Sequence, residues 1–282
     1  MPTFIQISLV MFAFAANSLL CRMALAQELI DPASFTMIRV IAGATMLVSL
    51  SLLGRQSVSS IFKLNGASVL IGVSLFCYAA CFSFAYTMLS TGTGALLLFG
   101  TVQLSLISWS YYQGQRFSSI EWAGISLSSV GFAILVLPSA EQPSLLSALL
   151  MVLSGLSWAV FTLVGKKQSS GLLSVTQGFV GASILSLLLI PWLIPNHSLT
   201  FDGVWLAVLS GAITSGLGYY LWYNVLPKIS TLKASISQLS VPAIAMLLGS
   251  FVLNEPLTLH TLALSAMILL GIAMTFWGKR KT

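Results

Sequence analysis

The strongest constraint on this chain of 282 residues is a succession of long apolar runs that carry almost no charge. Apolar residues make up 57% of the sequence and charged residues only 6%, against about 25% charged residues in an ordinary soluble domain. This leaves too little polar material to cover a soluble globule. We therefore predict an all-α integral membrane protein. The composition disfavours a soluble enzyme, a disordered chain and a nucleic-acid-binding protein.

Each apolar run is long enough to cross a bilayer, whose core of about 30 Å needs about 20 residues of helix. Glycine, proline, asparagine and charged residues divide the chain into ten runs: 3–26, 32–53, 65–86, 92–112, 119–138, 143–165, 173–194, 202–226, 233–253 and 257–277. The loops between them are short. We expect a bundle of ten transmembrane helices, with any function built inside it.

The charges in the loops predict the orientation of the bundle. If the N-terminus is cytoplasmic, ten of the twelve basic residues lie on the cytoplasmic side: Arg55, Lys63, Arg116, Lys166, Lys167, Lys228, Lys233, Lys279, Arg280 and Lys281. The positive-inside rule then holds at every loop and places both termini in the cytoplasm. It also supports the number of ten, because one missed helix would invert every later loop.

Acidic residues stand at the expected starts of four helices, where the helix dipole favours a carboxylate. These residues are Asp31, Glu141, Asp202 and Glu255. Asp31 and Glu255 each precede a proline, which suits the first position of a helix. Residues 118–121, with Ser118 and Glu121 at their ends, have the sequence of a capping box. We expect all of these acids to be structural.

A signal peptide is the alternative interpretation of the first run. Residues 13–15 resemble a small-x-small cleavage site, but no basic residue precedes the apolar run, as a signal peptide requires. We expect the segment to remain as a helix.

Cysteine and histidine usage predicts neither disulfides nor a metal site. The three cysteines lie inside apolar runs, and the two histidines stand far from them in the sequence: Cys21, Cys77, Cys81, His197 and His260. We therefore expect small packing side chains at the cysteines, and no cofactor.

The two halves of the chain are similar at an offset of about 140 residues. Residues 17–18, 115–117 and 131–133 align with 157–158, 255–257 and 271–273. Five helices per half is an odd number, so the second repeat must be inverted relative to the first. We predict two inverted five-helix repeats, at 1–140 and 141–282, an architecture common in secondary transporters.

Several motifs resemble one family. They lie at 17–25 (NSLLCRMAL), 38–40 (IRV), 218–226 (GYYLWYNVL), 241–243 (VPA), 247–249 (LLG) and 254–258 (NEPLT). Together they resemble the drug/metabolite transporter superfamily, specifically its EamA-like ten-helix members. The chain departs from the family pattern at Ala15 and Ala16, where Trp-Gly is frequent, and at Val241, where Glu is frequent.

The resemblance implies a secondary transporter of small metabolites in the bacterial cytoplasmic membrane, working by alternating access and in the export direction. It leaves the substrate open, since the family handles amino acids, other metabolites and toxic compounds. The expected partners are a small-molecule substrate and the lipid bilayer, with no nucleic acid. A monomer is compatible with the sequence, which leaves the oligomeric state open.

Two arginines fall inside predicted helices. Arg39 is eight residues past Asp31, about 12 Å deep at 1.5 Å per residue, where a charge needs acceptors or a partner. It either joins neighbouring helices through their carbonyls and hydroxyls or attracts a substrate carboxylate. The family pattern favours the first role, because it carries a basic residue here whatever the substrate. Arg22 lies about one turn from its helix end, within reach of the interface by snorkelling.

Every acid is predicted to lie near a membrane surface. Compact four-helix relatives of the superfamily exchange protons for organic cations at a carboxylate within the membrane. That mechanism is therefore disfavoured here. Neutral, zwitterionic or anionic metabolites, amino acids among them, are the better candidates.

A passage for polar solutes needs polar and aromatic side chains at depth. The candidate substrate-binding residues are Asn17, Ser18, Arg39, Tyr78, Gln103, Trp158, Tyr219, Tyr223 and Gln238. Hydrogen bonds that only join helices are the alternative for each. The resemblance implies a cavity formed by the first, third, fourth, sixth, eighth and ninth helices. Gly216, Gly218 and Pro242 are candidate gating residues, because glycine and proline allow a helix to bend.

Two other functions compete with transport. An integral-membrane enzyme is disfavoured because no HExxH motif and no acid pair within the membrane occurs. A structural or lipid-scrambling protein would pack the same helices without a cavity. A deep pocket that reaches Asn17, Gln103, Tyr219 and Gln238 would favour transport, and a bundle packed solid at its centre would count against it.

Overall fold

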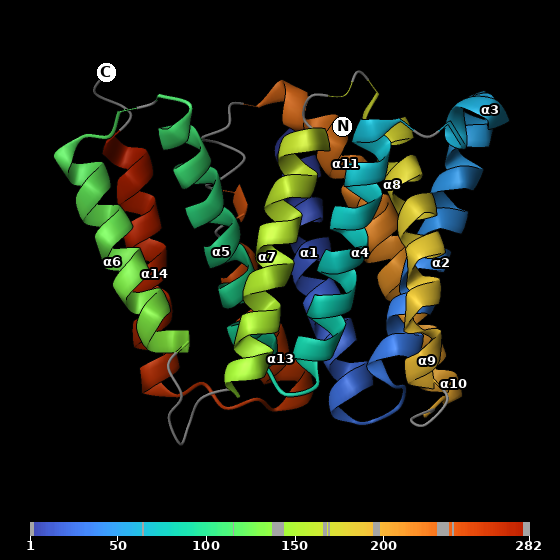
Figure 1. Cartoon of the computed structure of the whole chain (residues 1–282). Coiled ribbons are helices and arrows are strands. Elements are labelled where there is room, and N and C mark those ends of the chain that lie inside the picture. The colour runs from blue at the N-terminus through green and yellow to red at the C-terminus, as the bar shows by residue number, and fades with distance from the viewer. Residues whose placement is uncertain are drawn as a thin grey trace.

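The structure, a computed structural model, is a bundle of helices (Figure 1). It describes residues 3–63, 65–114, 116–136, 144–165, 168, 170–193, 198–229, 237–238 and 240–278. Its α-helices are α1 (Thr3–Ala26), α2 (Pro32–Leu53), α3 (Val58–Ile61), α4 (Gly66–Tyr86), α5 (Thr91–Tyr112), α6 (Ser119–Val136), α7 (Leu145–Gly165), α8 (Gly171–Leu185), α9 (Ile190–Leu193), α10 (Phe201–Leu209), α11 (Gly218–Val225), α13 (Ser240–Leu253) and α14 (Leu259–Gly278). Short segments of other helix types are η1 (Ser186–Leu189), η2 (Ser210–Leu217) and η3 (Leu226–Lys228).

Seven helices of the described part are long and apolar enough to cross a membrane: α1, α2, α4, α5, α7, the helix at 171–189 and the helix at 201–228. Shorter apolar helices occur at 240–253 and 259–271. The only β pairing in the described ranges is one bridge between Ile30 and Leu199. The all-α membrane class is thus confirmed. The number of ten helices and the inverted repeat stay predictions.

Two of the predicted helix starts have the expected caps. Asp31 Oδ1 accepts a hydrogen bond of 2.8 Å from the Ser34 amide, and Pro32 is the first residue of α2. At the start of α6 the Ser118 amide donates to Glu121 Oε2 at 2.6 Å, and the Glu121 amide donates to Ser118 Oγ at 3.4 Å. These reciprocal bonds are the predicted capping box.

The other acidic residues predicted to start helices are Glu141, Asp202 and Glu255, and they differ in where the structure has them. Asp202 lies in the first turn of α10, as predicted, and Glu141 lies outside the described residues. Glu255 does not begin the last helix. That helix starts at Leu259, and Thr258 Oγ1 accepts a bond of 3.2 Å from the amide three residues later. A threonine supplies this cap, so the Glu255 carboxylate is free to bind elsewhere.

The predicted run at 202–226 is not a uniform α-helix. Between α10 and α11 it contains the π-helical segment η2, which includes Gly211 and Gly216. Gly211 packs on the backbone of α2, where an added Cβ would collide with the Arg39 carbonyl group. A Cβ at Gly43, on the facing side of α2, would collide with the Phe179 ring and lie 3.0 Å from the Gly211 carbonyl oxygen. Short π-helical segments inside α-helices are frequent at functional sites.

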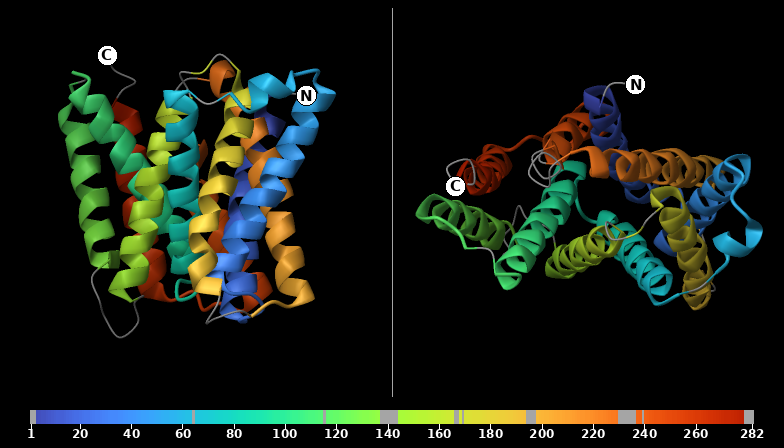
Figure 2. Two further views of the ribbon diagram at one scale, coloured as in Figure 1. Left: turned by 45° about the vertical axis from the view of Figure 1, so that its right-hand side comes forward. Right: turned by 90° about the horizontal axis from the view of Figure 1, so that it is seen from above.

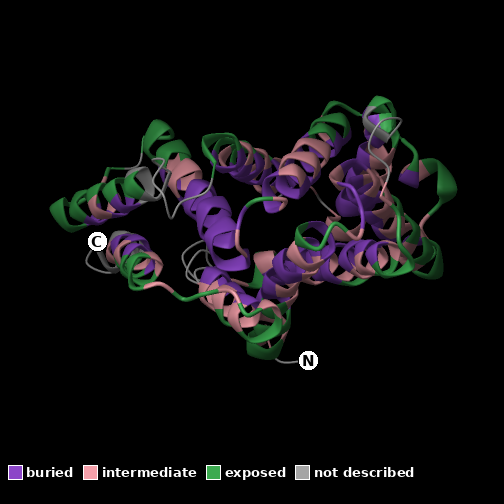
Figure 3. Ribbon diagram, turned by 90° about the horizontal axis from the view of Figure 1, so that it is seen from below, coloured by how far each residue is buried: buried purple, intermediate pink, exposed green. Residues whose placement is uncertain are grey.

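The bundle has a central group of helices and a separate pair at one side. The pair is α6 with α14, which pack mainly on each other (Figure 2). Gly271 allows this close approach, because a Cβ there would lie 2.5 Å from the Ser128 amide nitrogen. Buried residues gather on the inner faces of the other helices (Figure 3). The functional site therefore has to be sought among the central helices.

We expect Gly211→Ala to lower the thermal stability of the purified protein by an amount equivalent to about 1–3 kcal/mol, the usual cost of overpacking a core. The added methyl group would collide with backbone, which cannot move aside as a side chain would. The measurement is the unfolding midpoint in detergent. Gly66→Ala is the matched control, because nothing lies within 4 Å of a Cβ there. Equal midpoints for the two variants would contradict the packing argument.

Candidate functional site

The centre of the bundle contains a cluster of polar side chains, formed by Asn17 of α1, Arg39 of α2, Tyr78 of α4, Ser215 of η2 and Tyr219 of α11; we call it the central polar cluster. Arg39 is only 1% exposed. Its Nη2 donates to the Tyr78 hydroxyl at 3.0 Å and to the Tyr219 hydroxyl at 3.3 Å, and its Nε donates to Ser215 Oγ at 3.2 Å. Arg39 thereby joins α2 to three other segments.

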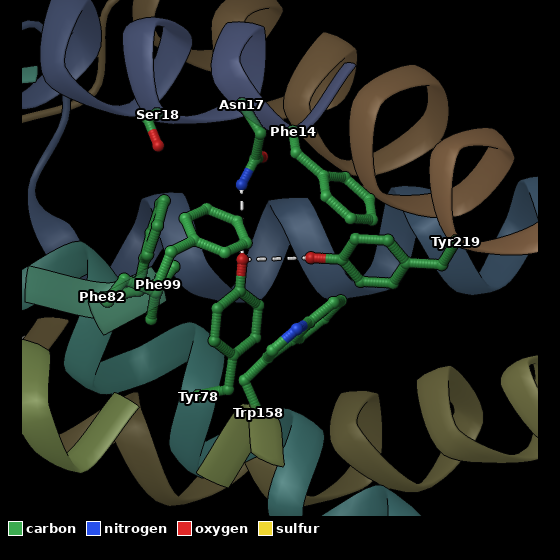
Figure 4. Close-up of a pocket in the computed structure, with 9 residues that line it drawn as sticks. Phe14, Asn17, Ser18, Tyr78, Phe82, Phe99, Trp158 and Tyr219 are labelled. Carbon is green, nitrogen blue, oxygen red and sulfur yellow. Dashed lines mark hydrogen bonds between the residues drawn. The ribbon is translucent and has the colours of Figure 1, made fainter. Parts of the chain in front are cut away.

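The Tyr78 hydroxyl is the meeting point of the cluster (Figure 4). It lies 3.0 Å from the Tyr219 hydroxyl, and Asn17 Nδ2 donates to it at 3.4 Å. Asn17 Oδ1 in turn accepts bonds of 2.7–3.3 Å from three hydroxyl groups of η2, those of Ser210, Thr214 and Ser215. The side chains of four segments are thus held in one network.

Aromatic rings also stabilise the buried charge. The guanidinium carbon of Arg39 lies 4.8 Å from the centre of the Phe82 ring and 5.2 Å from that of Tyr78. Rings at these distances attract a cation through their quadrupoles. Within the described residues no carboxylate lies within 4.0 Å of Arg39, and the ion pair found there involves Arg22. Among the described residues, hydroxyls and aromatic rings therefore stabilise Arg39.

A small cavity adjoins the cluster. Its volume is about 10 Å³, which is room for about one water molecule. It is lined by Phe14, Asn17, Ser18, Tyr78, Phe82, Leu98, Phe99, Trp158 and Tyr219. The rings around it are in contact: the centre of the Trp158 ring lies 4.7 Å from that of Tyr219 and 4.9 Å from that of Tyr78. The bundle is therefore almost closed at its centre, where a transporter would be expected to hold a deep pocket.

A second polar site joins distant parts of the chain at the end of the bundle where α1 ends. Arg22 Nε lies 3.3 Å from Glu255 Oε1, and the side chains are 20% and 14% exposed. Arg22 Nη1 also donates to the carbonyl oxygens of Tyr86 and Thr87, at 3.0 Å each. Arg22 is therefore held by a carboxylate and by the backbone carbonyls at the end of α4, all of them groups of the protein itself.

Glu255 caps α5 instead of the last helix. Its two carboxylate oxygens accept from the Thr91 amide at 3.0 and 2.8 Å. Two local features put it there. Asn254 adopts φ 53°, a left-handed conformation that asparagine tolerates, and Gly249 leaves the room that a Cβ would take from the carboxylate.

The comparisons with known proteins agree with this architecture. The model of the EamA-like transporter family matches residues 145–277. An uncharacterized protein of Pseudomonas aeruginosa is 42% identical over 94% of this chain and 91% of its own length. The chain belongs to the EamA-like transporter family. It is thus a multi-pass membrane transporter of the drug/metabolite transporter superfamily.

More distant relatives of this EamA-like transporter cover most of the chain. An uncharacterized transporter of Archaeoglobus fulgidus is 25% identical over 86% of this chain and 88% of its own length. One solved crystal structure matches with a TM-score of 0.69 at 18% identity, covering 97% of this chain and 98% of the other. At that identity the match shows the fold alone.

Five of the nine predicted substrate-binding residues line the cavity, and a sixth forms hydrogen bonds with two of these lining residues. The five are Asn17, Ser18, Tyr78, Trp158 and Tyr219, and the sixth is Arg39. The other three, Gln103, Tyr223 and Gln238, do not line it. Tyr223 instead donates to the Phe161 carbonyl oxygen at 3.2 Å, because it lies one helical turn beyond Tyr219. The binding role of all nine stays a prediction.

The predicted gating residues also lie outside the cavity lining. Gly216 belongs to η2 and packs near Gly43, and Gly218 is the first residue of α11. Pro242 is buried as the third residue of α13, whose preceding residues 230–236 lie outside the described part. Their role in gating stays a prediction.

Four apolar lining residues were missed, because an apolar ring in a membrane helix is indistinguishable by type from a packing residue. These are Phe14, Phe82, Leu98 and Phe99. Ser215 was missed as a partner of Arg39, although a buried guanidinium has to find acceptors. Among the described residues no group of three or more His, Cys, Asp or Glu side chains has the arrangement of a metal site.

We expect the Arg22–Glu255 ion pair to show energetic coupling of about 1 kcal/mol, within the range for contacting residues. Arg22→Met and Glu255→Gln should each lower the unfolding midpoint in detergent. The double variant should lower it by less than the sum of the two shifts, since the first substitution already removes the attraction. Strictly additive shifts would show that the pair contributes nothing beyond its separate contacts to backbone.

Proposed function

We propose that this EamA-like protein is a secondary transporter that exports small neutral, zwitterionic or anionic metabolites across the bacterial cytoplasmic membrane by alternating access. The observation that carries the proposal is the central polar cluster, a set of buried polar groups that α1, α2, α4, η2 and α11 supply together beside a small cavity. Polar groups deep in a membrane bundle mark substrate pathways by default.

Pairs of residues at the repeat offset support an inverted repeat around this cluster. Tyr78 and Tyr219 are 141 residues apart in sequence, and their hydroxyls are bonded at 3.0 Å. Their contact would lie on the axis that relates the two repeats, where inverted-repeat transporters place the substrate.

Two close backbone contacts repeat in the same way. A Cβ at Gly72 of α4 would lie 3.2 Å from the Cα of Gly181 in α8, and a Cβ at Gly43 of α2 would lie 3.0 Å from the Gly211 carbonyl oxygen in η2. Gly72 and Gly211 are 139 residues apart, and Gly43 and Gly181 are 138 apart. The helix contacts α1–α13 and α1–α11 likewise have the counterparts α7–α5 and α7–α4. These correspondences support repeats at 1–140 and 141–282.

The closed centre fits one state of a transport cycle. The Arg22–Glu255 ion pair joins α1 and the α4–α5 turn of the first half to the α13–α14 loop of the second half. Its loss would free one end of the bundle. In alternating access the halves would rock against each other, so that the central polar cluster faces one side of the membrane and then the other.

A nearly solid centre is also what a structural or lipid-scrambling protein would show, and an integral-membrane enzyme is the remaining alternative. Transport is preferred because the chain belongs to a family of transporters. The experiment below separates transport from these alternatives without requiring knowledge of the substrate.

We expect Ser18→Cys, made in a variant in which Cys21, Cys77 and Cys81 are replaced by alanine, to react with a membrane-impermeant maleimide from both sides. Ser18 lines the cavity and is 1% exposed, so its reaction reports opening of the centre. Labelling is measured on intact cells and on inside-out vesicles.

Ser128→Cys in the same background is the matched control. Ser128 is equally buried, but it lies in the α6–α14 pair and outside the cavity, so it should react from neither side. Alternating access is refuted if Ser18→Cys reacts from one side only or from neither.

The termini bear on the orientation. The start of α1 and the end of α14 lie at the same end of the bundle (Figure 1), and the loop charges predict that this end is cytoplasmic. A fluorescent-protein reporter fused after Thr282 should therefore fluoresce, and an alkaline phosphatase fused there should stay inactive, because the phosphatase folds only outside the cytoplasm. The opposite pair of results would invert the topology.

A further inference from the structure

We propose that the cavity at the central polar cluster binds the carboxylate of a monoanionic metabolite whose remaining body is apolar and planar. The proposal rests on the proposed transport function and adds the chemistry of the substrate. It is carried by a surplus of hydrogen-bond donors, by the uncompensated charge of Arg39 and by the rings that line the cavity.

The cluster has more donors than acceptors. Its strongest acceptor, Asn17 Oδ1, already accepts from the hydroxyls of Ser210 and Ser215, which fill its two lone pairs. Arg39 donates into the oxygens of both Tyr78 and Tyr219. The bond between these two oxygens uses one of the two phenol protons and leaves the other for an acceptor outside the pair. A ligand that enters the cavity therefore finds more hydrogen-bond donors than acceptors in the central polar cluster.

Two further donors are buried without a hydrogen-bond partner. They are Nη1 of Arg39 and Nε1 of Trp158, whose side chains are 1% and 2% exposed. A buried polar group that makes no hydrogen bond is destabilising, and a charged one more so. Trp158 lines the cavity itself. A carboxylate would supply two oxygens, each able to accept more than one of these bonds.

The charge of the site selects the sign of the ligand. Arg39 is buried, and no carboxylate of the described residues lies within 4.0 Å of it. A buried charge without a counter-charge is costly, so an anion is favoured over a neutral ligand. Aromatic cavities also bind cations, but Arg39 already occupies the faces of Tyr78 and Phe82 and would repel a second positive charge.

The lining selects the body of the ligand. Six of its nine residues are aromatic: Phe14, Tyr78, Phe82, Phe99, Trp158 and Tyr219. Their rings now touch one another across about 10 Å³ of space. A planar apolar body would have to separate Tyr78 of α4 from Trp158 of α7 and Tyr219 of α11 (Figure 4). Binding would therefore separate side chains of the two predicted repeats, which links occupancy to the opening that transport requires.

The test uses a series of probes that share one ring and differ in the head group: phenylacetate, phenylacetamide and 2-phenylethylamine, with charges of −1, 0 and +1 at neutral pH. Binding to the purified full chain in detergent is measured by calorimetry and by the ligand-dependent rise of the unfolding midpoint. We expect phenylacetate to bind at least about tenfold more tightly than the amide, and the amine to bind most weakly. Phenyl phosphate, a second oxyanion, should bind more weakly than phenylacetate, because its head carries close to two negative charges at neutral pH and Arg39 supplies only one positive charge.

Two tryptophan variants separate binding from folding. Trp158 and Trp222 are both buried with an unpartnered Nε1, and only Trp158 lines the cavity. Trp158→Phe should weaken phenylacetate binding about fivefold or more and leave the amine unaffected, whereas Trp222→Phe should leave the head-group order and the phenylacetate affinity unchanged.

Several outcomes would overturn the proposal. They are equal binding of the three phenyl probes, preference for the amine, phenyl phosphate binding as tightly as phenylacetate, and the same loss of affinity in both tryptophan variants. Absence of binding by any probe overturns it as well. If Ser18→Cys is nevertheless labelled from both sides, the transport function stands and only the carboxylate assignment fails.

Discussion

The burial of one positive charge, that of Arg39, constrains the centre of this transporter more than any other interaction. An arginine at the middle of a membrane helix costs roughly 2.5–3.5 kcal/mol on insertion scales, so its donors must find acceptors inside the protein. Tyr78, Ser215 and Tyr219 supply them from three other segments. Because each bond needs a separation near 3 Å, the guanidinium fixes how α2, α4, η2 and α11 lie around it.

This arrangement depends on glycine at the helix contacts. Gly211 packs directly on the Arg39 carbonyl group, and Gly43 faces Gly211 from α2. In lipid, helices associate through close packing and interhelical bonds instead of a hydrophobic driving force, so the missing side chains allow the backbones to approach. The π-helical turn that contains Gly211 carries the hydroxyls of Ser210, Thr214 and Ser215 to Asn17. One local deviation from α-helix thus serves both the packing and the polar network.

The sequence predicted what depends on composition and local spacing, namely the membrane class, most helix bounds, the capping box at Ser118 and the need of Arg39 for acceptors inside the protein. It predicted poorly what depends on contacts between distant segments. Glu255 was expected to start the helix that follows it, yet its partners Arg22 and Thr91 are 233 and 164 residues away. Gln103 and Tyr223 are as polar as the residues that line the cavity, but each lies one helical turn beyond a lining residue, Phe99 and Tyr219 respectively, and so lies outside it.

The proposed repeat has an asymmetric centre, with consequences for the two states of a transport cycle. In the register set by Gly43 and Gly181, which are 138 residues apart, Arg39 corresponds to Gln177, an uncharged residue whose Nε2 donates to the carbonyl oxygens of Ser60 and Lys63. At an offset of 140 residues, Arg22 and Glu255 correspond to Thr162 and Gln115, neither of them charged. An inverted repeat with identical halves would have two access states of equal energy. Here the first half alone supplies the central charge, and among the described residues only one end has an ion pair between the halves. The two access states must therefore differ in energy. A ligand shifts the populations of two states only through its different affinity for them. An anion that binds Arg39 would therefore favour the access state in which Arg39 lies nearest to the cavity.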